Sequence, residues 1–285
     1  MSKLRFSRKL LSIPYGIFLG LFVIIPLILI FIYAFTKEVE TGVTPHFWYR
    51  NEGYRFTFDN VVSFFGNISN INTFIVSVLI GIANTIICIL IGYPIAYILA
   101  KKEYNFSFIV VILFIMPMWI NFVLRTSATR EMFYGLKTLT GIDITGASHP
   151  YLATMIGIVY NYLPFVVLPL YTTMIKMNRS LIEASMDLGA NPFQTFVKTI
   201  IPMTLPGVIS AVNMVFMPTM SSFVISDVMG ERQVSLIGNS IQIYFDQSMW
   251  HLGSFFALIM LVIIIVSMIA TRNMEKEENA RGSLW

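Results

Sequence analysis

The residues of this chain that could do chemistry gather in one polar segment, 181–202, between two long apolar stretches. Glu183 and Asp187 are four residues apart and share a helical face that the neighbouring apolar residues leave free. Gly189 permits a left-handed backbone turn that other residues resist. Pro202 would end a second helix and let the chain enter the next apolar stretch. The segment therefore predicts two short helices at an angle, which form a surface for a cytoplasmic partner.

The sequence does not indicate catalysis, because it holds no nucleophile, acid–base or metal-ligand cluster. His46, His149 and His251 are scattered without the spacing of metal ligands. The single cysteine, Cys88, lies inside an apolar stretch and excludes an intrachain disulfide. The chain also lacks the G-x-x-x-x-G-K-[ST] pattern of a phosphate-binding loop. We therefore expect no catalytic residue, no metal site and no cofactor bound by this chain.

The elements that position the polar segment are apolar stretches of membrane-spanning length. The chain is 56% hydrophobic and 12% charged, with a mean hydropathy of +0.74, whereas about a quarter of the residues in a soluble domain are charged. Six stretches are long enough to cross roughly 30 Å of hydrocarbon as helices. They lie near 12–35, 73–99, 106–126, 151–174, 201–225 and 252–270. The sequence thus predicts an all-α integral membrane protein, with one transmembrane domain over residues 1–285.

The basic residues predict how the chain is oriented. Of its 19 lysines and arginines, 12 would lie on the side of the N-terminus and seven on the opposite side. Basic residues concentrate on the cytoplasmic side of membrane proteins, so we expect both termini and the polar segment to be cytoplasmic. The basic excess is a topology signal and does not indicate nucleic-acid binding. The first apolar stretch is too long for a secretory signal and is expected to be retained.

The polar segment resembles the EAA motif of ABC importer permeases, whose pattern is Glu-Ala-Ala, three residues, Gly, nine residues, Ile, one residue, Leu-Pro. The positions in register are Glu183, Ala184, Ser185, Gly189 and Pro202. The chain departs from the pattern where Ser185, Thr199 and Ile201 replace alanine, isoleucine and leucine. The resemblance implies that the segment is a coupling loop for an ATPase. The residues it assigns to coupling are Glu183, Ala184, Ser185, Asp187, Gly189, Ala190, Phe193 and Pro202.

Further segments are similar to the B-type permeases of spermidine/putrescine importers, which belong to the MetI-like type I family. These segments are residues 160–171, 224–230 and 235–241, with LeuArgThr at 124–126 upstream, and the similarity covers roughly 119–272. The resemblance implies a type I permease fold of six transmembrane helices in a bacterial inner membrane. It also implies a heterodimer with a second related permease, two cytoplasmic ATPase subunits that bind ATP and magnesium, and an external polyamine-binding protein. The chain itself would then be a transport subunit and not an enzyme.

A transported polyamine needs acceptors that also release it, and carboxylates and aromatic rings meet that need. The candidates near the outer half of the bundle are Asp227, Trp119, Asn121, Tyr160, Tyr162 and Asn213. For Asp227 two interpretations stay open: it lines the path, or it pairs with Arg125, Arg130 or Arg232. The aromatic residues have their own alternative, as membrane-interface anchors or core residues.

Three classes of function compete at this point. The first is a permease of an ATP-driven importer, for polyamines or for another small solute such as ferric iron. The second is an ion-coupled secondary transporter, which would call for ionisable residues in mid-span and inverted repeats, and the sequence indicates neither. The third is an intramembrane enzyme, but the sequence holds no cluster of catalytic residues. We expect the first, with the choice between spermidine and putrescine made by the external binding protein.

Overall fold

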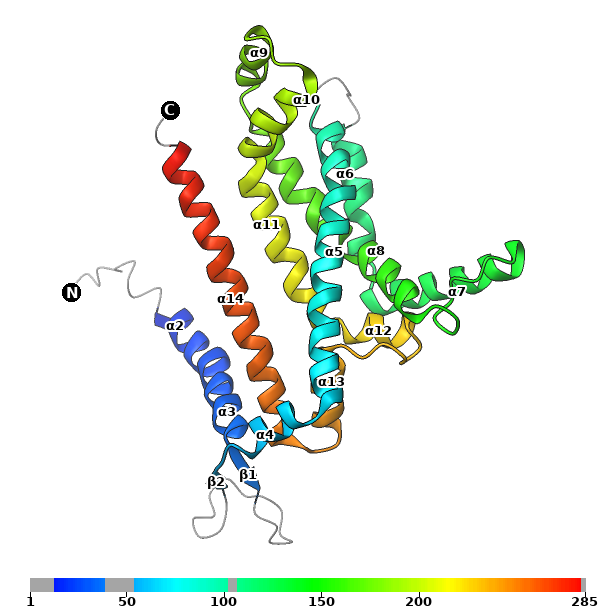
Figure 1. Cartoon of the computed structure of the whole chain (residues 1–285), viewed down its shortest axis with the longest axis vertical. Helices are drawn as coiled ribbons and strands as arrows, with labels where there is room; N and C mark the ends of the chain where they lie inside the picture. Colours follow the sequence, from blue (N-terminus) through cyan, green and yellow to red (C-terminus); the bar gives the residue numbers. More distant parts are fainter. Residues whose placement is uncertain (1–12, 39–53, 102–106, 283–285) are drawn as a thin grey trace, which may run out of the picture. The chain divides into compact units, whose positions relative to one another are not determined.

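The computed structural model describes residues 13–38, 54–101 and 107–282, which are almost entirely helical (Figure 1). They form two compact units, each made of segments from different parts of the chain. The first unit comprises residues 1–71 and 240–262, and the second comprises 72–239 and 263–285. The all-helical class expected from the sequence is confirmed.

The first unit contains an N-terminal apolar helix and a small polar cap. The helix consists of α2 (Ile13–Leu19), a π-helical turn (Gly20–Ile24) and α3 (Ile25–Ala34). The short strands β1 (Thr36–Glu38) and β2 (Tyr54–Phe56) follow and pair antiparallel, ahead of α4 (Asp59–Gly66). Asn60 Nδ2 donates to the backbone oxygens of Ala34 and Thr36, at 2.9 and 3.1 Å. The first of these bonds satisfies a carbonyl at the end of α3, which the helix leaves without a partner of its own, and the second reaches β1.

The second unit holds the remaining helices. They are α6 (Ser107–Ile115), the 3₁₀ turn η2 (Met116–Trp119), α7 (Phe122–Thr140), α8 (Pro150–Ile175), α9 (Arg179–Asp187), α10 (Pro192–Thr195), the π-helical turn η3 (Phe196–Ile200), α11 (Ile201–Met220) and α12 (Phe223–Met229). Three helices run through the boundary between the units: α5 (Ile68–Ala100), α13 (Ile237–Asp246) and α14 (Trp250–Gly282).

Close packing and hydrogen bonds between helices hold the second unit together. α8 and α11 lie side by side (Figure 1), and a Cβ at Gly207 of α11 would lie 2.7 Å from the Thr173 hydroxyl of α8. Small residues allow such close approach in membranes. Two hydrogen bonds tie α5 to α11: Asn84 Nδ2 donates to Thr219 Oγ1, and the Tyr93 and Thr204 hydroxyls also bond, each pair at 2.7 Å.

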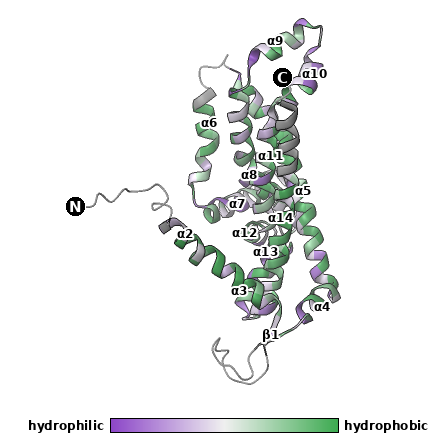
Figure 2. Cartoon of the chain, turned by 90° about the vertical axis from the view of Figure 1, so that its left-hand side faces the viewer, coloured by the Kyte–Doolittle hydropathy of each residue, from purple (hydrophilic) through white to green (hydrophobic). Residues whose placement is uncertain are grey.

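The described residues include five helices that are long and apolar enough to cross a membrane. They are Pro14–Ala34, Ile68–Ala100, Pro150–Ile175, Pro192–Met220 and Trp250–Thr271. The helices Ile109–Trp119 and Phe122–Thr140 meet at 99° and form a bent pair. If this pair is counted as one broken span, the number of candidate spans among the described residues is six. Figure 2 shows the long helices mostly as hydrophobic, with polar residues gathered on α7 and α9.

The helix bounds differ from the expected stretches at two prolines. The stretch 106–126 is broken because Pro117 lies in η2 and Asn121 caps a new helix in another direction. Pro202 does not end a helix, contrary to our expectation, since α10, η3 and α11 form one continuous helix. Ile201 N–H bonds to Phe196 O five residues earlier, so the backbone is widened just before Pro202, which has no N–H to donate.

Candidate functional site

The polar loop is a pair of short helices whose ends are fixed by local hydrogen bonds. Asn178 caps α9, since its Oδ1 accepts from Ser180 N at 3.1 Å. At the other end, Gly189 N bonds to Met186 O at 2.9 Å and Ala190 N bonds to Ser185 O at 3.2 Å. This is a Schellman motif, which requires a left-handed residue after the helix. Gly189 supplies it with φ of +87°.

The second helix of the loop begins two residues later with an equally well-defined cap. Asn191 Oδ1 accepts from Gln194 N at 2.8 Å, and Gln194 Oε1 accepts from Asn191 N at 3.0 Å. Such a reciprocal capping box satisfies two N–H groups that a helix start leaves unpaired. Pro192 occupies the first turn, where its missing N–H costs nothing. The turn between the helices is therefore short and conformationally defined.

The two helices of the loop touch through hydroxyl groups. Ser185 Oγ lies 3.3 Å from Thr195 Oγ1, and Thr199 Oγ1 donates to Ser185 Oγ at the same distance. Ser185 and Thr199 are two of the three positions that depart from the EAA pattern. In this chain the hydroxyl groups of Ser185 and Thr199 therefore contact each other at positions where the pattern has alanine and isoleucine.

The tip of the loop presents apolar side chains that the described part of the chain leaves exposed. Leu188 is 90% exposed and Phe193 is 73% exposed, although burying such a side chain stabilises by about 1.5–3 kcal/mol. Glu183, Ala184 and Asp187 are also exposed. In the described part of the chain neither carboxylate takes part in an ion pair. Exposed apolar residues rimmed by charges are typical of a protein-binding surface.

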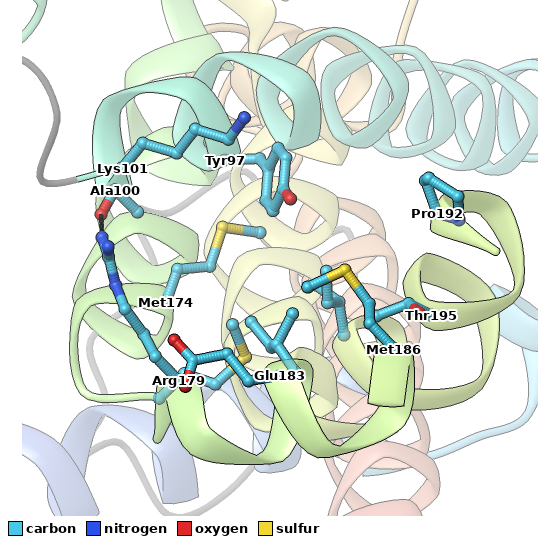
Figure 3. A pocket seen from close by; sticks show the side chains of 12 residues that line it. Tyr97, Ala100, Lys101, Met174, Arg179, Glu183, Met186, Pro192 and Thr195 are labelled. Carbon is cyan, nitrogen blue, oxygen red and sulfur yellow. Dashed lines mark hydrogen bonds between the residues drawn. The ribbon is translucent and has the colours of Figure 1, made fainter. Parts of the chain in front are cut away.

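A cavity of about 350 Å³ lies between this loop and the ends of α5 and α8 (Figure 3). Arg179 Nη2 donates to Ala100 O at 3.4 Å, and Lys101 Nζ lies 5.4 Å from the centre of the Tyr97 ring. Glu183 lines the cavity beside Arg179 (Figure 3). The cavity therefore separates part of α9 from the ends of α5 and α8.

Arg125 fixes the corner between η2 and α7. Its guanidinium is buried and donates to Asn161 Oδ1 from Nε and Nη2, at 2.8 and 2.6 Å, and to Pro117 O from Nη1 at 2.7 Å. No ion pair among the described residues includes it. The sequence indicated Arg125 as part of a segment shared with the B-type permeases and as a possible partner of Asp227, but not as the residue that fixes this corner. The missed signal was a single arginine in an apolar stretch, which usually marks a function in membrane proteins.

Three path candidates surround this corner. The Arg125 guanidinium lies 5.7 Å from the centre of the Tyr160 ring, so that ring face already holds a cation. Asn121 Oδ1 accepts from Val123 N and Leu124 N at 2.9 and 3.3 Å and thereby caps α7. Trp119 is 82% exposed.

Two other path candidates lie in contacts between helices of the second unit. The Tyr162 hydroxyl is 2.5 Å from Ser222 Oγ and donates to Pro218 O at 3.2 Å. Asn213 Oδ1 accepts from Thr271 Oγ1 at 3.1 Å. Both polar groups therefore have partners within the chain that hold neighbouring helices together.

Asp227 lines a different cavity, of about 380 Å³, beside the first half of α7. The other lining residues are Ser127, Arg130, Val228, Glu231 and Arg232. Asp227 Oδ1 accepts from Asn239 Nδ2 at 2.6 Å. Arg130 pairs instead with Glu131 and Glu231, at 2.9 and 3.5 Å. In the described part of the chain, none of the three arginines considered as partners forms an ion pair with Asp227.

Comparisons with known proteins agree with this architecture. Residues 5–278 match the family model described as "Binding-protein-dependent transport system inner membrane component". The chain is 39% identical over 184 residues to the spermidine/putrescine transport system permease protein PotB of Haemophilus influenzae, which covers 61% of this chain and 64% of the relative. It is 36% identical over 178 residues to PotB of Escherichia coli, covering 56% and 62%. These alignments thus span less than two thirds of either relative.

Solved structures share the fold. A bacterial ABC transporter involved in the import of the acidic polysaccharide alginate aligns with a TM-score of 0.59 at 15% identity, over 93% of this chain and 94% of the other. The MetNI methionine ABC transporter, in inward-facing conformations, aligns with a TM-score of 0.53 at 17% identity, over 73% and 95%. The fold class expected from the sequence, that of a type I importer permease, is confirmed.

Proposed function

Because this chain belongs to the binding-protein-dependent transport system inner membrane component family, we propose that it is the permease subunit of an ATP-driven importer that brings polyamines into the cytoplasm. The observation that carries the proposal is the capped helix pair at 178–195, which presents Leu188 and Phe193 to solvent. The names of the relatives, which refer to spermidine and putrescine, support the substrate class.

The proposed mechanism is alternating access driven from the polar loop. ATP and magnesium would be bound by a separate ATPase, since this sequence has no phosphate-binding loop. The helix Pro192–Met220 runs from the tip of the loop through a whole span and is about 43 Å long at 1.5 Å per residue. Movement of the loop when the ATPase closes would therefore tilt this span as a rigid body.

The proposed assembly contains a second related permease, two ATPase subunits and an external polyamine-binding protein. A solved alginate transporter of the same fold is in complex with a periplasmic protein that carries its ligand, which supports an external delivery protein here. The basic residues counted in the sequence support a cytoplasmic polar loop and cytoplasmic termini. No enzymatic step is proposed for this chain.

Gly189→Val is expected to uncouple ATP hydrolysis from transport. A β-branched residue in the left-handed region costs about 1–2 kcal/mol, and at φ of +87° the strain would open the Schellman turn. We expect uptake to fall at least about tenfold. Gly189→Asn is the matched control, since asparagine tolerates this conformation, and it should keep most of the activity. Full ATP-driven uptake by the valine variant would refute the proposed role of the turn.

Asp227→Asn is expected to lower polyamine uptake while leaving assembly intact. The substitution removes a charge that faces a cavity and that no arginine pairs with among the described residues. A carboxylate next to a cationic path attracts the substrate, so the Michaelis constant should rise more than the maximal rate falls. Asp246→Asn, at an exposed carboxylate that does not line this cavity, serves as the control. Unchanged uptake would remove Asp227 from the path.

The function as a whole is tested by uptake into proteoliposomes that contain the purified complex and trapped ATP. Radiolabelled putrescine and spermidine should accumulate only with ATP and the binding protein present. Accumulation of ferric iron or another small solute in place of the polyamines would keep the importer and change its cargo. Uptake that follows an ion gradient without ATP would support a secondary transporter instead.

A further inference from the structure

Helix α7 turns sharply away from the span that precedes it. The half-span Ile109–Trp119 and α7 meet at 99°, and Figure 1 shows α7 running across the direction of α6 and α8. α6 contacts α8, one of the helices of spanning length, and spanning helices tilt on average by only about 20° from the membrane normal. A helix at a right angle to such a span lies close to the plane of the membrane.

One face of α7 packs on the protein. Arg130 Nη2 lies 3.5 Å from a Glu231 carboxylate oxygen, and the Tyr134 hydroxyl donates to the same oxygen. At the end of the helix, Lys137 Nζ pairs with Asp143 at 2.7 Å. This pair, with hydrogen bonds from Ser148 and Thr145, keeps the pKa of the Asp143 carboxyl far below its usual range. α7 is thus fastened to Glu231, which lines the Asp227 cavity, and to the loop that follows its own end.

The opposite face of α7 carries an apolar stripe that no described residue covers. The stripe consists of Leu124, Ala128, Met132, Leu136 and Leu139, which follow one another at intervals of three or four residues. Leu124 is 66% exposed, Met132 is 71% exposed and Leu139 is 87% exposed. Side chains at this spacing share one side of a helix.

The stripe continues the exposed apolar surface of the preceding half-span. Exposed residues there are Ile112, Leu113, Met116, Trp119 and Ile120, and on a spanning helix such a surface faces lipid. Trp119 sits at the corner between the two helices, and tryptophan concentrates at the boundary between hydrocarbon and water. The exposed apolar surface of α6 therefore leads through Trp119 and Ile120 to α7, with the exposed Asn121 that caps α7 between them.

We propose that α7 is an interfacial helix, whose apolar stripe lies on the lipid surface at the boundary of headgroups and acyl chains, at the membrane face away from the polar loop. An amphipathic helix of this kind binds the interface through its buried apolar area. Through Arg130 and Tyr134 its other face holds Glu231 at the rim of the Asp227 cavity. Lipid bound to the stripe would thus stabilise the position of Arg130, Tyr134 and Glu231 beside the cavity. The proposal requires that the chain span a membrane, but not that it transport polyamines.

The test is spin labelling of the assembled complex in nanodiscs of phosphatidylethanolamine and phosphatidylglycerol. Cys88 is buried and is replaced by serine, and single cysteines are placed at Met132 and Leu136. Thr138→Cys is the matched control, because Thr138 is exposed on the same helix but lies off the stripe. Collision rates are measured with oxygen, which concentrates in lipid, and with a nickel chelate, which stays in water. Each variant must first show the thermal unfolding transition of the unlabelled complex.

We expect the ratio of oxygen to nickel collisions to be at least about fivefold higher at positions 132 and 136 than at 138. Strong nickel collisions at all three positions would place the stripe in water and overturn the proposal. Weak collisions with both reagents at 132 and 136 would mean that protein covers the stripe, as a second permease would, and would overturn it as well. Because the readout needs no transport, a wrong substrate assignment leaves this result unaffected.

Discussion

Replacing Phe193 by aspartate is expected to detach the ATPase and stop ATP-driven uptake, while the amount of permease in the membrane stays unchanged. Phe193 is 73% exposed, so the substitution removes little packing within the chain. Aromatic residues at the centre of interfaces typically contribute 2 kcal/mol or more to binding, and a loss of about 3 kcal/mol weakens binding over 100-fold. The affinity of the ATPase for the permease in nanodiscs measures the effect directly.

Two further variants make this result specific. Leu188→Asp changes the other exposed apolar residue at the tip, 90% exposed, and should weaken ATPase binding in the same way. Phe193→Tyr keeps the ring and should bind normally. If Phe193→Asp retains the affinity of the unsubstituted chain, the ATPase contacts a different surface and the proposed role of the loop is wrong.

Substitutions in the Arg125 hydrogen-bond network are expected to destabilise the second unit. Comparing the stability lost in Asn161→Leu and in Arg125→Leu separates the cost of an unpaired buried charge from the cost of lost hydrogen bonds. Asn161→Leu leaves the buried guanidinium with one acceptor fewer, and an incompletely paired buried charge costs about 3–5 kcal/mol. Arg125→Leu removes the charge together with its bonds and leaves only neutral acceptors unpaired, at about 1–3 kcal/mol. Thermal unfolding in mild detergent should therefore show a larger loss for Asn161→Leu.

The double variant provides the control for this prediction. Since the two residues share their hydrogen bonds, Arg125→Leu with Asn161→Leu should lose less stability than the sum of the single variants. Equal and additive effects of the two changes would mean that Arg125 does not depend on Asn161, and that another contact holds the corner of the broken span.

The features of the site that could be read from the sequence are those with local causes. Gly189 and the Asn191-Pro192 pair predict a left-handed turn and a helix start from their own conformational preferences, and the structure has both. The length and apolar character of the spans likewise predict membrane helices, because lipid leaves the backbone few alternatives.

Other features depended on tertiary contacts and were missed or misjudged. Pro202 was expected to end a helix, but a π-helical turn before it lets the helix continue. The break at 120–121 is fixed by Arg125 through an asparagine 36 residues away, which no local pattern reveals. The candidate path residues Tyr162 and Asn213 bond neighbouring helices, contacts that depend on which side chains the fold brings together, and their place on the path stays a prediction.

The central claim is that this chain is driven by an ATPase docked on its polar loop, and the most direct test is purification of the tagged chain in mild detergent with its partners identified by mass spectrometry. We predict recovery of an ATPase, a second EAA-bearing permease and a binding protein that retains polyamine. A disulfide between cysteines introduced at Leu188 and in the ATPase should then form in the same complex. A chain that is purified alone under conditions that preserve such assemblies, or an ATPase that cannot be cross-linked to the loop, would contradict the account.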